Sequence, residues 1–246
     1  MSVKYVLITG ATAGTGLAIA RRFLKEGYGV CLTSRREEDA KKAAATLAES
    51  FKLPVRGFKL DPAEGETGVN AVFEEIDDLH ALVLNSANLG MTPSLADPLT
   101  LDIKEWSEVI NTNVVWNFML ARSAARLMQD HGGAIVFIGS NTSRRAVVGR
   151  SAYIASKGAI AAMTKALALD FAPYGIRVNC LMPGMIATIR WDARSAADQA
   201  ACNKQIPLGK VATFEDIAEG AFFLAHCATQ STGSEMIIDG GVDARL

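Results

Sequence analysis

Residues 4–16 read KYVLITGATAGTG and place three glycines, Gly10, Gly14 and Gly16, directly after a short apolar run. The apolar run is typical of a β-strand, and the following LAIARRFL is amphipathic, as in a helix. Glycines between a strand and a helix permit a tight turn and let backbone N–H groups approach a pyrophosphate. A merely tight turn is the alternative, but the strand before and the helix after favour a nucleotide-binding loop.

Short apolar runs and amphipathic stretches alternate along the rest of the chain. The runs are mostly continuous rather than alternating, as expected of strands that are covered on both faces. This order predicts an α/β fold with a doubly wound parallel sheet. The predicted strands are 4–9, 28–33, 55–59, 80–84, 134–139, 177–181 and 235–239, and the predicted helices are 16–26, 37–50, 66–77, 103–130, 152–172 and 213–226.

The length of the chain favours a single domain, residues 1–246. The charge balance favours a small molecule as its partner. Lys plus Arg number 25 against 26 Asp plus Glu, so no global field favours nucleic acid or an anionic membrane. The four cysteines and three histidines are scattered, which predicts neither a disulfide framework nor a metal site. The chain shows no signal peptide and no apolar run of membrane-spanning length, so we expect a cytoplasmic protein with reduced thiols.

The second predicted strand is followed by Ser34, Arg35 and Arg36. NAD-selective proteins commonly place an acid at this point to hold the ribose 2′-OH. Guanidinium groups instead suit a 2′-phosphate, because they bind phosphate through paired hydrogen bonds. These residues predict NADP(H) rather than NAD(H); the alternative is a solvated charge pair at the start of the next helix.

Tyr153 and Lys157 are four residues apart in a predicted helix, so both side chains project from one face. Such a pair also occurs by chance, so further polar groups are needed to mark a site. Ser140 ends a predicted strand, and Asn113 lies inside an otherwise apolar helical stretch. All four side chains are expected to meet at the carboxyl edge of the sheet.

Taken together, these motifs resemble the short-chain dehydrogenase/reductase family over essentially the whole chain. The resemblance implies a single Rossmann-type domain with about seven parallel strands flanked by helices, a nicotinamide cofactor, and a homotetramer or homodimer. It also implies a catalytic tetrad of Asn113, Ser140, Tyr153 and Lys157. The matching segments are TGATAGTG (9–16), NSAN (85–88), the four tetrad positions, IRVNCLMPG (176–184), Thr188 and IIDGG (237–241).

The resemblance assigns a role to each member of the tetrad. Tyr153 would exchange a proton with the substrate oxygen while hydride passes between the cofactor and the carbonyl carbon. The Lys157 ammonium would favour the tyrosinate and hold the nicotinamide ribose. Ser140 would hydrogen-bond the substrate oxygen, and Asn113 would support a water that relays protons to the lysine.

Further positions match cofactor contacts of the family. Asp61 corresponds to the residue that contacts adenine, although Asp-Pro also commonly starts a turn. Asn85 and Ala87 correspond to the nicotinamide side. The glycine loop contributes Gly10, Thr12, Gly14, Thr15 and Gly16, and the segment that holds the carboxamide contributes Pro183, Gly184, Ile186 and Thr188.

The chain departs from the family at Asn88, where a glycine is usual, and at Ala13, where many NADP-dependent relatives have a basic residue. Asparagine tolerates the left-handed backbone region better than most residues, so the loop is expected to survive. Without a basic residue at 13, phosphate recognition would depend on residues 34–36.

Two segments bear on the substrate. Arginines near a pocket favour an anionic substrate; the alternative is that they face solvent or a neighbouring subunit. Residues 185–207 follow a strand and are expected to form a substrate lid, with an ordinary surface loop as the alternative. The arginines in question are Arg144, Arg145, Arg150 and Arg190.

The leading interpretation is an NADP(H)-dependent carbonyl reductase that also acts as an alcohol dehydrogenase on a small molecule. A 3-oxoacyl carrier reductase is the alternative among enzymes. A protein that senses NADP or serves as a scaffold without turnover is the alternative from another class, although a pure binder has no evident need for Tyr153 and Ser140 together.

Overall fold

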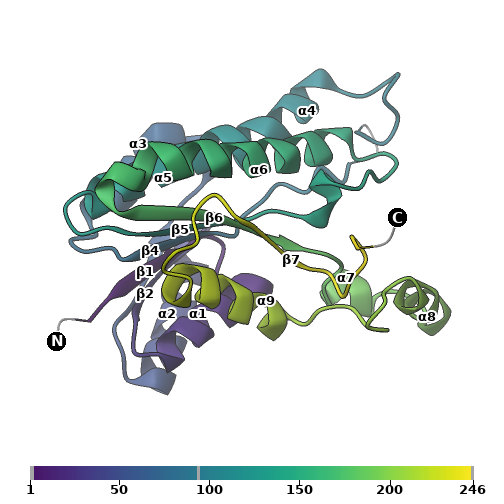
Figure 1. Cartoon of the computed structure of the whole chain (residues 1–246). Coiled ribbons are helices and arrows are strands. Elements are labelled where there is room, and N and C mark those ends of the chain that lie inside the picture. Colours follow the sequence, from purple (N-terminus) through teal and green to yellow (C-terminus); the bar gives the residue numbers. More distant parts are fainter. Residues whose placement is uncertain (1–2, 93–94, 245–246) are drawn as a thin grey trace.

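A single sheet of seven parallel strands forms the centre of the computed structural model, which describes residues 3–92 and 95–244 (Figure 1). The strand order is β3-β2-β1-β4-β5-β6-β7. This confirms the predicted doubly wound parallel sheet. The strands are β1 Tyr5–Ile8, β2 Gly29–Ser34, β3 Val55–Lys59, β4 Ala81–Leu84, β5 Gly133–Ile138, β6 Ile176–Pro183 and β7 Glu235–Ile238.

The central strands are apolar on both faces because helices cover both sides of the sheet. All four residues of β4, ALVL, are buried, as are Val6, Leu7 and Ile8 of β1. An all-parallel sheet needs this double cover, which explains why the strand sequences read as continuous apolar runs.

Figure 1 shows α1, α2 and α9 below the sheet and α3, α4, α5 and α6 above it. Below the sheet, the Phe23 ring of α1 packs edge to face against the Phe222 ring of α9, with 5.2 Å between the ring centroids. Above it, Leu120 of α5 packs in one cluster with Phe137 of β5. The helices are α1 Gly14–Lys25, α2 Glu37–Phe51, α3 Gly65–Glu74, α4 Ile103–Ile110, α5 Trp116–Met128, α6 Ser151–Phe171, α7 Ile189–Asp192, α8 Ala196–Lys204 and α9 Phe214–Phe222.

The strand order reverses between β1 and β4, which are neighbours in the sheet. Ligands of open α/β sheets bind at such a reversal, beyond the carboxyl ends of the strands. Here the Thr9 N–H donates to the Val83 carbonyl at 3.0 Å, so the chain leaving β1 lies beside the chain leaving β4. The glycine loop and residues 85–88 therefore border the same crevice.

The predicted helix 103–130 is not one regular α-helix. Residues Asn111–Val115 form a π-helical turn between α4 and α5. A π turn inserts one extra residue into a helix and often marks a functional site. The predicted helix 213–226 likewise ends in a π turn, Phe223–Cys227, after α9.

Residues 185–207 fold into the two short helices α7 and α8, which lie beside the sheet at the right of Figure 1. Within the described ranges, no helix combines the length and apolar character needed to cross a membrane. The described His, Cys, Asp and Glu side chains also form no group of three or more that could hold a metal ion.

Candidate active site

The glycine loop needs glycine at positions 10 and 16 for different reasons. Gly10 has φ +63°, a backbone conformation that residues with a Cβ rarely adopt. A Cβ on Gly16 would lie 2.3 Å from the Gly10 carbonyl oxygen, which is backbone and has no rotamer with which to move away. The close turn that the sequence predicted after β1 is present.

Asn85, the first residue after β4, holds this loop in place. Its amide nitrogen donates to the carbonyls of Thr9 at 3.0 Å and Gly10 at 3.1 Å. In return, the Thr9 hydroxyl accepts from the backbone N–H groups of Asn85 and Ser86. Asn85 therefore stabilises the glycine loop by binding its carbonyl groups. Its expected place on the nicotinamide side of the cofactor stays a prediction.

The N-terminus of α1 has unsatisfied donors at the crevice. Its first turn contains no acidic residue, and the N-cap residue Ala13 makes no side-chain hydrogen bond to the helix. The first N–H groups of a helix have no partner within the helix and favour negative charge. Together with the close approach that Gly10 and Gly16 allow, this fits the pyrophosphate of a dinucleotide.

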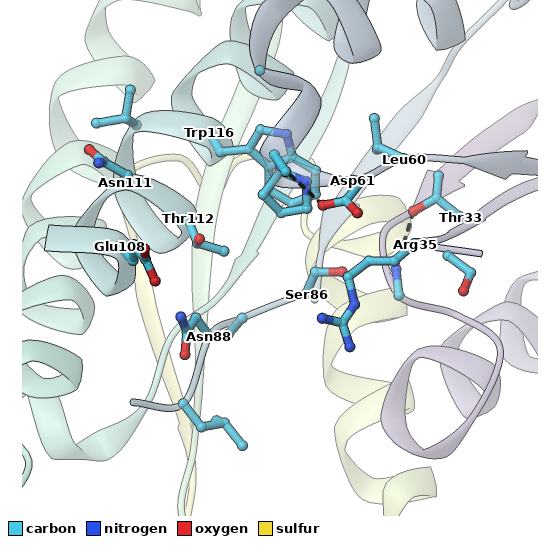
Figure 2. Close-up of a pocket in the computed structure, with 18 of the residues that line it drawn as sticks. Thr33, Arg35, Leu60, Asp61, Ser86, Asn88, Glu108, Asn111, Thr112 and Trp116 are labelled. Atoms are coloured by element: carbon cyan, nitrogen blue, oxygen red, sulfur yellow. Dashed lines mark hydrogen bonds between the residues drawn. The ribbon is translucent and has the colours of Figure 1, made fainter. Parts of the chain in front are cut away.

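A cavity of about 1450 Å³ opens along this edge of the sheet (Figure 2). It exceeds the roughly 300–1,000 Å³ of ordinary small-molecule pockets, so it has room for a dinucleotide. Its walls come from the glycine loop, the ends of β2, β3 and β4, and the α4–α5 turn. The predicted cofactor residues that line it are Gly10, Thr12, Ser34, Arg35, Arg36, Asp61 and Ala87.

Asp61 starts a short turn as well as lining the cavity. It caps the 3₁₀ turn Pro62–Glu64 by accepting a hydrogen bond from the Ala63 N–H at 3.0 Å. The turn-starting alternative is therefore confirmed, and the same carboxylate borders the cavity. Figure 2 shows it at the end of the cavity where Trp116 and Leu60 also lie.

Tyr153 and Lys157 lie on α6 as the four-residue spacing requires. The Lys157 ammonium is 5.5 Å from the centroid of the Tyr153 ring and donates to the Ile138 carbonyl at 2.7 Å. Lys157 is only 3% exposed. Burial raises the pKa of the nearby Cys180 thiol to about 11, so this thiol stays neutral beside the ammonium.

Ser140 follows β5, one residue beyond Gly139. Its hydroxyl oxygen accepts hydrogen bonds from the Thr142 N–H at 3.2 Å and the Thr142 hydroxyl at 2.9 Å. With two donors already on its oxygen, the Ser140 proton is free to point to an acceptor outside this turn. The side chain is buried, with 8% exposure.

Asn113 lies in the π turn and is fully buried. Its side-chain oxygen accepts from the Asn88 N–H at 2.7 Å, and its amide nitrogen donates to the Asn88 carbonyl at 2.8 Å and to Ser156 at 3.0 Å. Ser156 in turn donates to the Tyr153 carbonyl. Asn113 thus ties the loop after β4 to the first turns of α6, and its expected role toward a water stays a prediction.

Asn88 replaces the family glycine without backbone strain. Lys52 is the one non-glycine residue with positive φ in the described chain, so Asn88 does not use the left-handed region. Its side-chain oxygen accepts from the Gly90 N–H at 3.0 Å, and Gly90 carries the positive φ instead. The side chain also lines the cavity (Figure 2).

The four arginines that suggested an anionic substrate all have protein partners, and none lines the cavity. Arg144 pairs with Asp243 at 2.9 Å, and Arg145 donates to the Val242 carbonyl. Arg150 donates to the Leu89 carbonyl at 2.7 Å, and Arg190 contacts the sulfur of Met91. Arg144 is the one with acidic partners, whereas the contacts given above for the other three are to neutral groups and leave their charge uncompensated, so the anionic substrate stays a prediction.

The segment after β6 lies beside the end of β5, because β5 and β6 pair up to Ile138 and Leu181. A Cβ on Gly184 would lie 2.6 Å from the Asp239 side chain, so this approach requires glycine. Ile186 bridges to Ala212, and Thr188 is the N-cap of α7. Pro183, Gly184, Ile186 and Thr188 do not line the described cavity, and their contact with a carboxamide stays a prediction.

The sequence analysis missed Thr142 and Ser156 at the site, and it named Arg150 only for its charge, without the contact with Tyr153. Thr142 bonds Ser140, Ser156 links Asn113 to Tyr153, and the Arg150 guanidinium lies 4.8 Å from the Tyr153 ring centroid. Such cation–aromatic contacts are attractive. The first two lie within three residues of a predicted site residue, and this proximity is the signal that could have indicated them.

Comparison with known proteins gives full-length matches. A family model described as enoyl-(acyl carrier protein) reductase matches residues 10–243. The 2-(R)-hydroxypropyl-CoM dehydrogenase of Xanthobacter autotrophicus is 34% identical over 98% of this chain and 99% of that protein. The NADP-dependent (R)-specific alcohol dehydrogenase of Lentilactobacillus kefiri is 32% identical, with 98% and 97% covered. The 3-oxoacyl-[acyl-carrier-protein] reductase of Aquifex aeolicus is 31% identical, with 97% of each covered.

Solved structures share the whole fold. ElxO with NADP bound has a TM-score of 0.88 and 30% identity, covering 99% of this chain and 100% of that one. NAD⁺-bound xylitol dehydrogenase has a TM-score of 0.85 and 27% identity, covering 97% and 98%. Both kinds of nicotinamide cofactor therefore occur among similar folds.

Proposed function

The chain belongs to the short-chain dehydrogenase/reductase family of nicotinamide-dependent oxidoreductases, and from this premise we propose that it is an NADP(H)-dependent enzyme that interconverts a ketone and a secondary alcohol on a small molecule. The observation that carries the proposal is the pairing of Tyr153 and Lys157 on α6, with the Lys157 ammonium bound to the carbonyl of Ile138, two residues before Ser140. A protein that only senses or binds NADP has no need for this set of groups.

In the proposed reaction, the nicotinamide group supplies or accepts the hydride at the carbonyl carbon. Tyr153 gives its phenolic proton to the carbonyl oxygen in reduction and takes it back in oxidation, so no free alkoxide has to accumulate. The buried Lys157 ammonium stabilises the phenolate that Tyr153 becomes after giving its proton.

Ser140 orients the substrate oxygen. Because Thr142 supplies two donors to the Ser140 oxygen, the Ser140 hydroxyl can donate its own proton to the substrate carbonyl. Asn113 has a positioning role: its hydrogen bonds to Asn88 and Ser156 fix the loop after β4 against α6. The proposal thus has two donors at the oxygen, one of which moves a proton.

The choice of NADP(H) over NAD(H) is supported by Arg35, which lines the cavity just after β2, where no acid takes the place expected for NAD. Similarity to an NADP-dependent alcohol dehydrogenase and to NADP-bound ElxO also supports it. The NAD⁺-bound xylitol dehydrogenase is the counterexample that makes a direct measurement necessary.

The test is NADPH consumption by the purified protein across neutral ketones, acidic ketones, sugars and acyl thioesters, each repeated with NADH and with Tyr153→Phe. Turnover by the wild type with NADPH and not by Tyr153→Phe supports the proposal. Equal rates with NADH would contradict the proposed preference for NADP(H). Tight NADPH binding with no turnover on any of these substrate classes would favour the sensor alternative.

A 3-oxoacyl carrier reductase is the second candidate, favoured by the Aquifex relative, which is named as such; the matching family model, described as enoyl-(acyl carrier protein) reductase, shares only the carrier-linked class of substrate. This candidate predicts that thioester-linked 3-oxoacyl substrates react faster than free ketones of the same chain length. Faster reaction of the free ketones would exclude it.

Assembly as a homotetramer or homodimer is proposed from the family resemblance. The outer faces of α5 and α6 expose Phe118 and Leu169, the latter at 77%, and these side chains are available for a copy of the chain. The scattered cysteines and the balanced charge support a cytoplasmic location as a further proposal. Sedimentation of the purified protein measures the assembly directly.

A further inference from the structure

The two arginines that follow β2 have different surroundings. The Arg35 guanidinium extends from the wall of the cavity in Figure 2, and no ion pair or hydrogen bond joins it to another part of the described chain. Arg36 instead binds Asp39 through two nitrogens, Nε and Nη2, each 2.6 Å from the same carboxylate oxygen. One guanidinium is thus available, and the other is already paired.

We propose that Asp39 is a specificity-determining residue that weakens recognition of the cofactor 2′-phosphate by holding and neutralising Arg36, so that Arg35 provides most of that recognition. This inference rests on the proposed use of NADP(H) and adds to it a residue that works against it. It predicts a cofactor site whose preference for the phosphate is moderate and can be raised by one substitution.

Charge at the site supports this assignment. Asp39 lies in the first turn of α2 and itself lines the cavity, as Arg35 and Arg36 do. Two arginines and one aspartate leave a net charge of +1 where a phosphate of about −2 would sit. A carboxylate several ångströms from such a group repels it, and the repulsion is only partly screened at physiological salt.

The alternative role of Asp39 is to orient Arg36 toward the phosphate. The contact geometry argues against it, because both Arg36 nitrogens converge on one oxygen of a side chain three residues away. The Arg36 side chain is 80% exposed, so apart from this pair little holds its guanidinium in one place. Releasing Arg36 should therefore help phosphate binding more than the loss of order harms it.

Glu38 provides a matched control for charge. It lies in the same turn of α2 and is exposed, but it neither lines the cavity nor forms an ion pair with Arg36 or any other cation of the described chain. Glu38→Gln and Asp39→Asn each remove one carboxylate charge and keep the side-chain size. Any difference between them reports on the pairing with Arg36 and on the position of Asp39 at the cavity.

The experiment is calorimetric titration of the intact protein with adenosine 2′,5′-bisphosphate and, separately, with adenosine 5′-monophosphate, which lacks the 2′-phosphate. We expect Asp39→Asn to tighten the bisphosphate about three- to tenfold and to leave the monophosphate unchanged. Glu38→Gln should change both by less than about twofold. Thermal melting of each variant checks that the protein is folded.

Arginine variants complete the test. Arg35→Met should weaken the bisphosphate by about tenfold or more, because a free guanidinium binds phosphate through charge-assisted hydrogen bonds. Arg36→Met should weaken it by less than about threefold. Adding Arg36→Met to Asp39→Asn should remove most of the gain, because the gain depends on the released guanidinium.

The outcomes separate this inference from the proposed cofactor. A wild type that prefers the bisphosphate, with Asp39→Asn no better than Glu38→Gln or worse than wild type, would overturn the role of Asp39 and keep NADP(H). If the wild type binds the bisphosphate and the monophosphate equally and Asp39→Asn prefers the bisphosphate, NADP(H) as the cofactor is overturned and the role of Asp39 is supported. No preference in any variant would overturn both.

Discussion

The two sides of the crevice are built differently. The side proposed for the cofactor, residues 9–16, 34–39, 61–65 and 85–88, is braced by hydrogen bonds such as those from Asn85 to the glycine loop. The side proposed for the substrate, residues 141–150 and 185–207, consists of short turns and the exposed helices α7 and α8. The proposed cofactor side thus depends on backbone geometry at the ends of the central strands, whereas the proposed substrate side depends on short, exposed elements beyond the sheet.

Tyr153→Phe should give the largest difference between the effect on turnover and the effect on cofactor affinity. Turnover should fall by about 10²–10⁴-fold or more, because the variant has no proton to exchange with the substrate oxygen. Cofactor affinity should change little, since no cavity wall is altered. Rates of NADPH oxidation and a cofactor titration measure both, with Tyr174→Phe, an exposed tyrosine beyond α6, as the control. Comparable loss in the control would remove the special role of Tyr153.

Gly16→Ala should distort the glycine loop on the side proposed for the cofactor. The new Cβ meets the Gly10 carbonyl oxygen at 2.3 Å, so the loop has to shift, at a cost of about 1–3 kcal/mol in unfolding free energy or a matching loss of cofactor affinity. Denaturant unfolding and cofactor titration measure the two. Gly158→Ala in α6, where a Cβ meets nothing within 4 Å, is the control and should be neutral or stabilising. Unchanged affinity and stability in Gly16→Ala would mean that the loop is less rigid than its contacts indicate.

Thr142→Val tests the substrate side. Removing the hydroxyl that donates to Ser140 should lower kcat about three- to tenfold, as expected for one hydrogen bond, and leave cofactor affinity unchanged. Thr142→Ser keeps the hydroxyl and should recover most of the rate. If the serine variant is as slow as the valine variant, the hydroxyl is not what matters.

Thr213→Ala should have the smallest effect on activity. Thr213 and Asp216 form a capping box at the start of α9, just after Ala212, which bridges to Ile186. Losing the cap should cost about 1 kcal/mol of stability, seen as a lower Tm, with no change in cofactor affinity.

The pH dependence of that stability checks the cause. Hydrogen bonds from Thr213 hold the pKa of Asp216 below its usual 3.8. The stabilisation from this carboxylate is therefore present above that value and is lost as the pH falls through the lower pKa of the folded state. The gap in stability between wild type and Thr213→Ala should shrink in strong acid, and a constant gap would point to a cause other than this carboxylate.

Much of the architecture was predictable because its signals are local. Continuous apolar runs such as ALVL predicted central strands, and the spacing of Gly10 and Gly16 between a strand and a helix predicted a close turn. The π turn at Asn111–Val115 was missed, since an extra residue in a helix changes the hydrophobic periodicity too little to be read.

The amino-acid sequence alone was enough to predict the central strands and the helices that cover them, the glycine loop, and the shared face of Tyr153 and Lys157, because backbone geometry and helical periodicity act over a few residues. The three-dimensional fold was needed to show that Asn113 binds Asn88, that Arg144 pairs with Asp243, that Arg150 donates to the Leu89 carbonyl, and that Asn85 braces the loop. Most of these partners lie tens of residues apart, and a charged or amide side chain binds whichever partner the fold brings within reach.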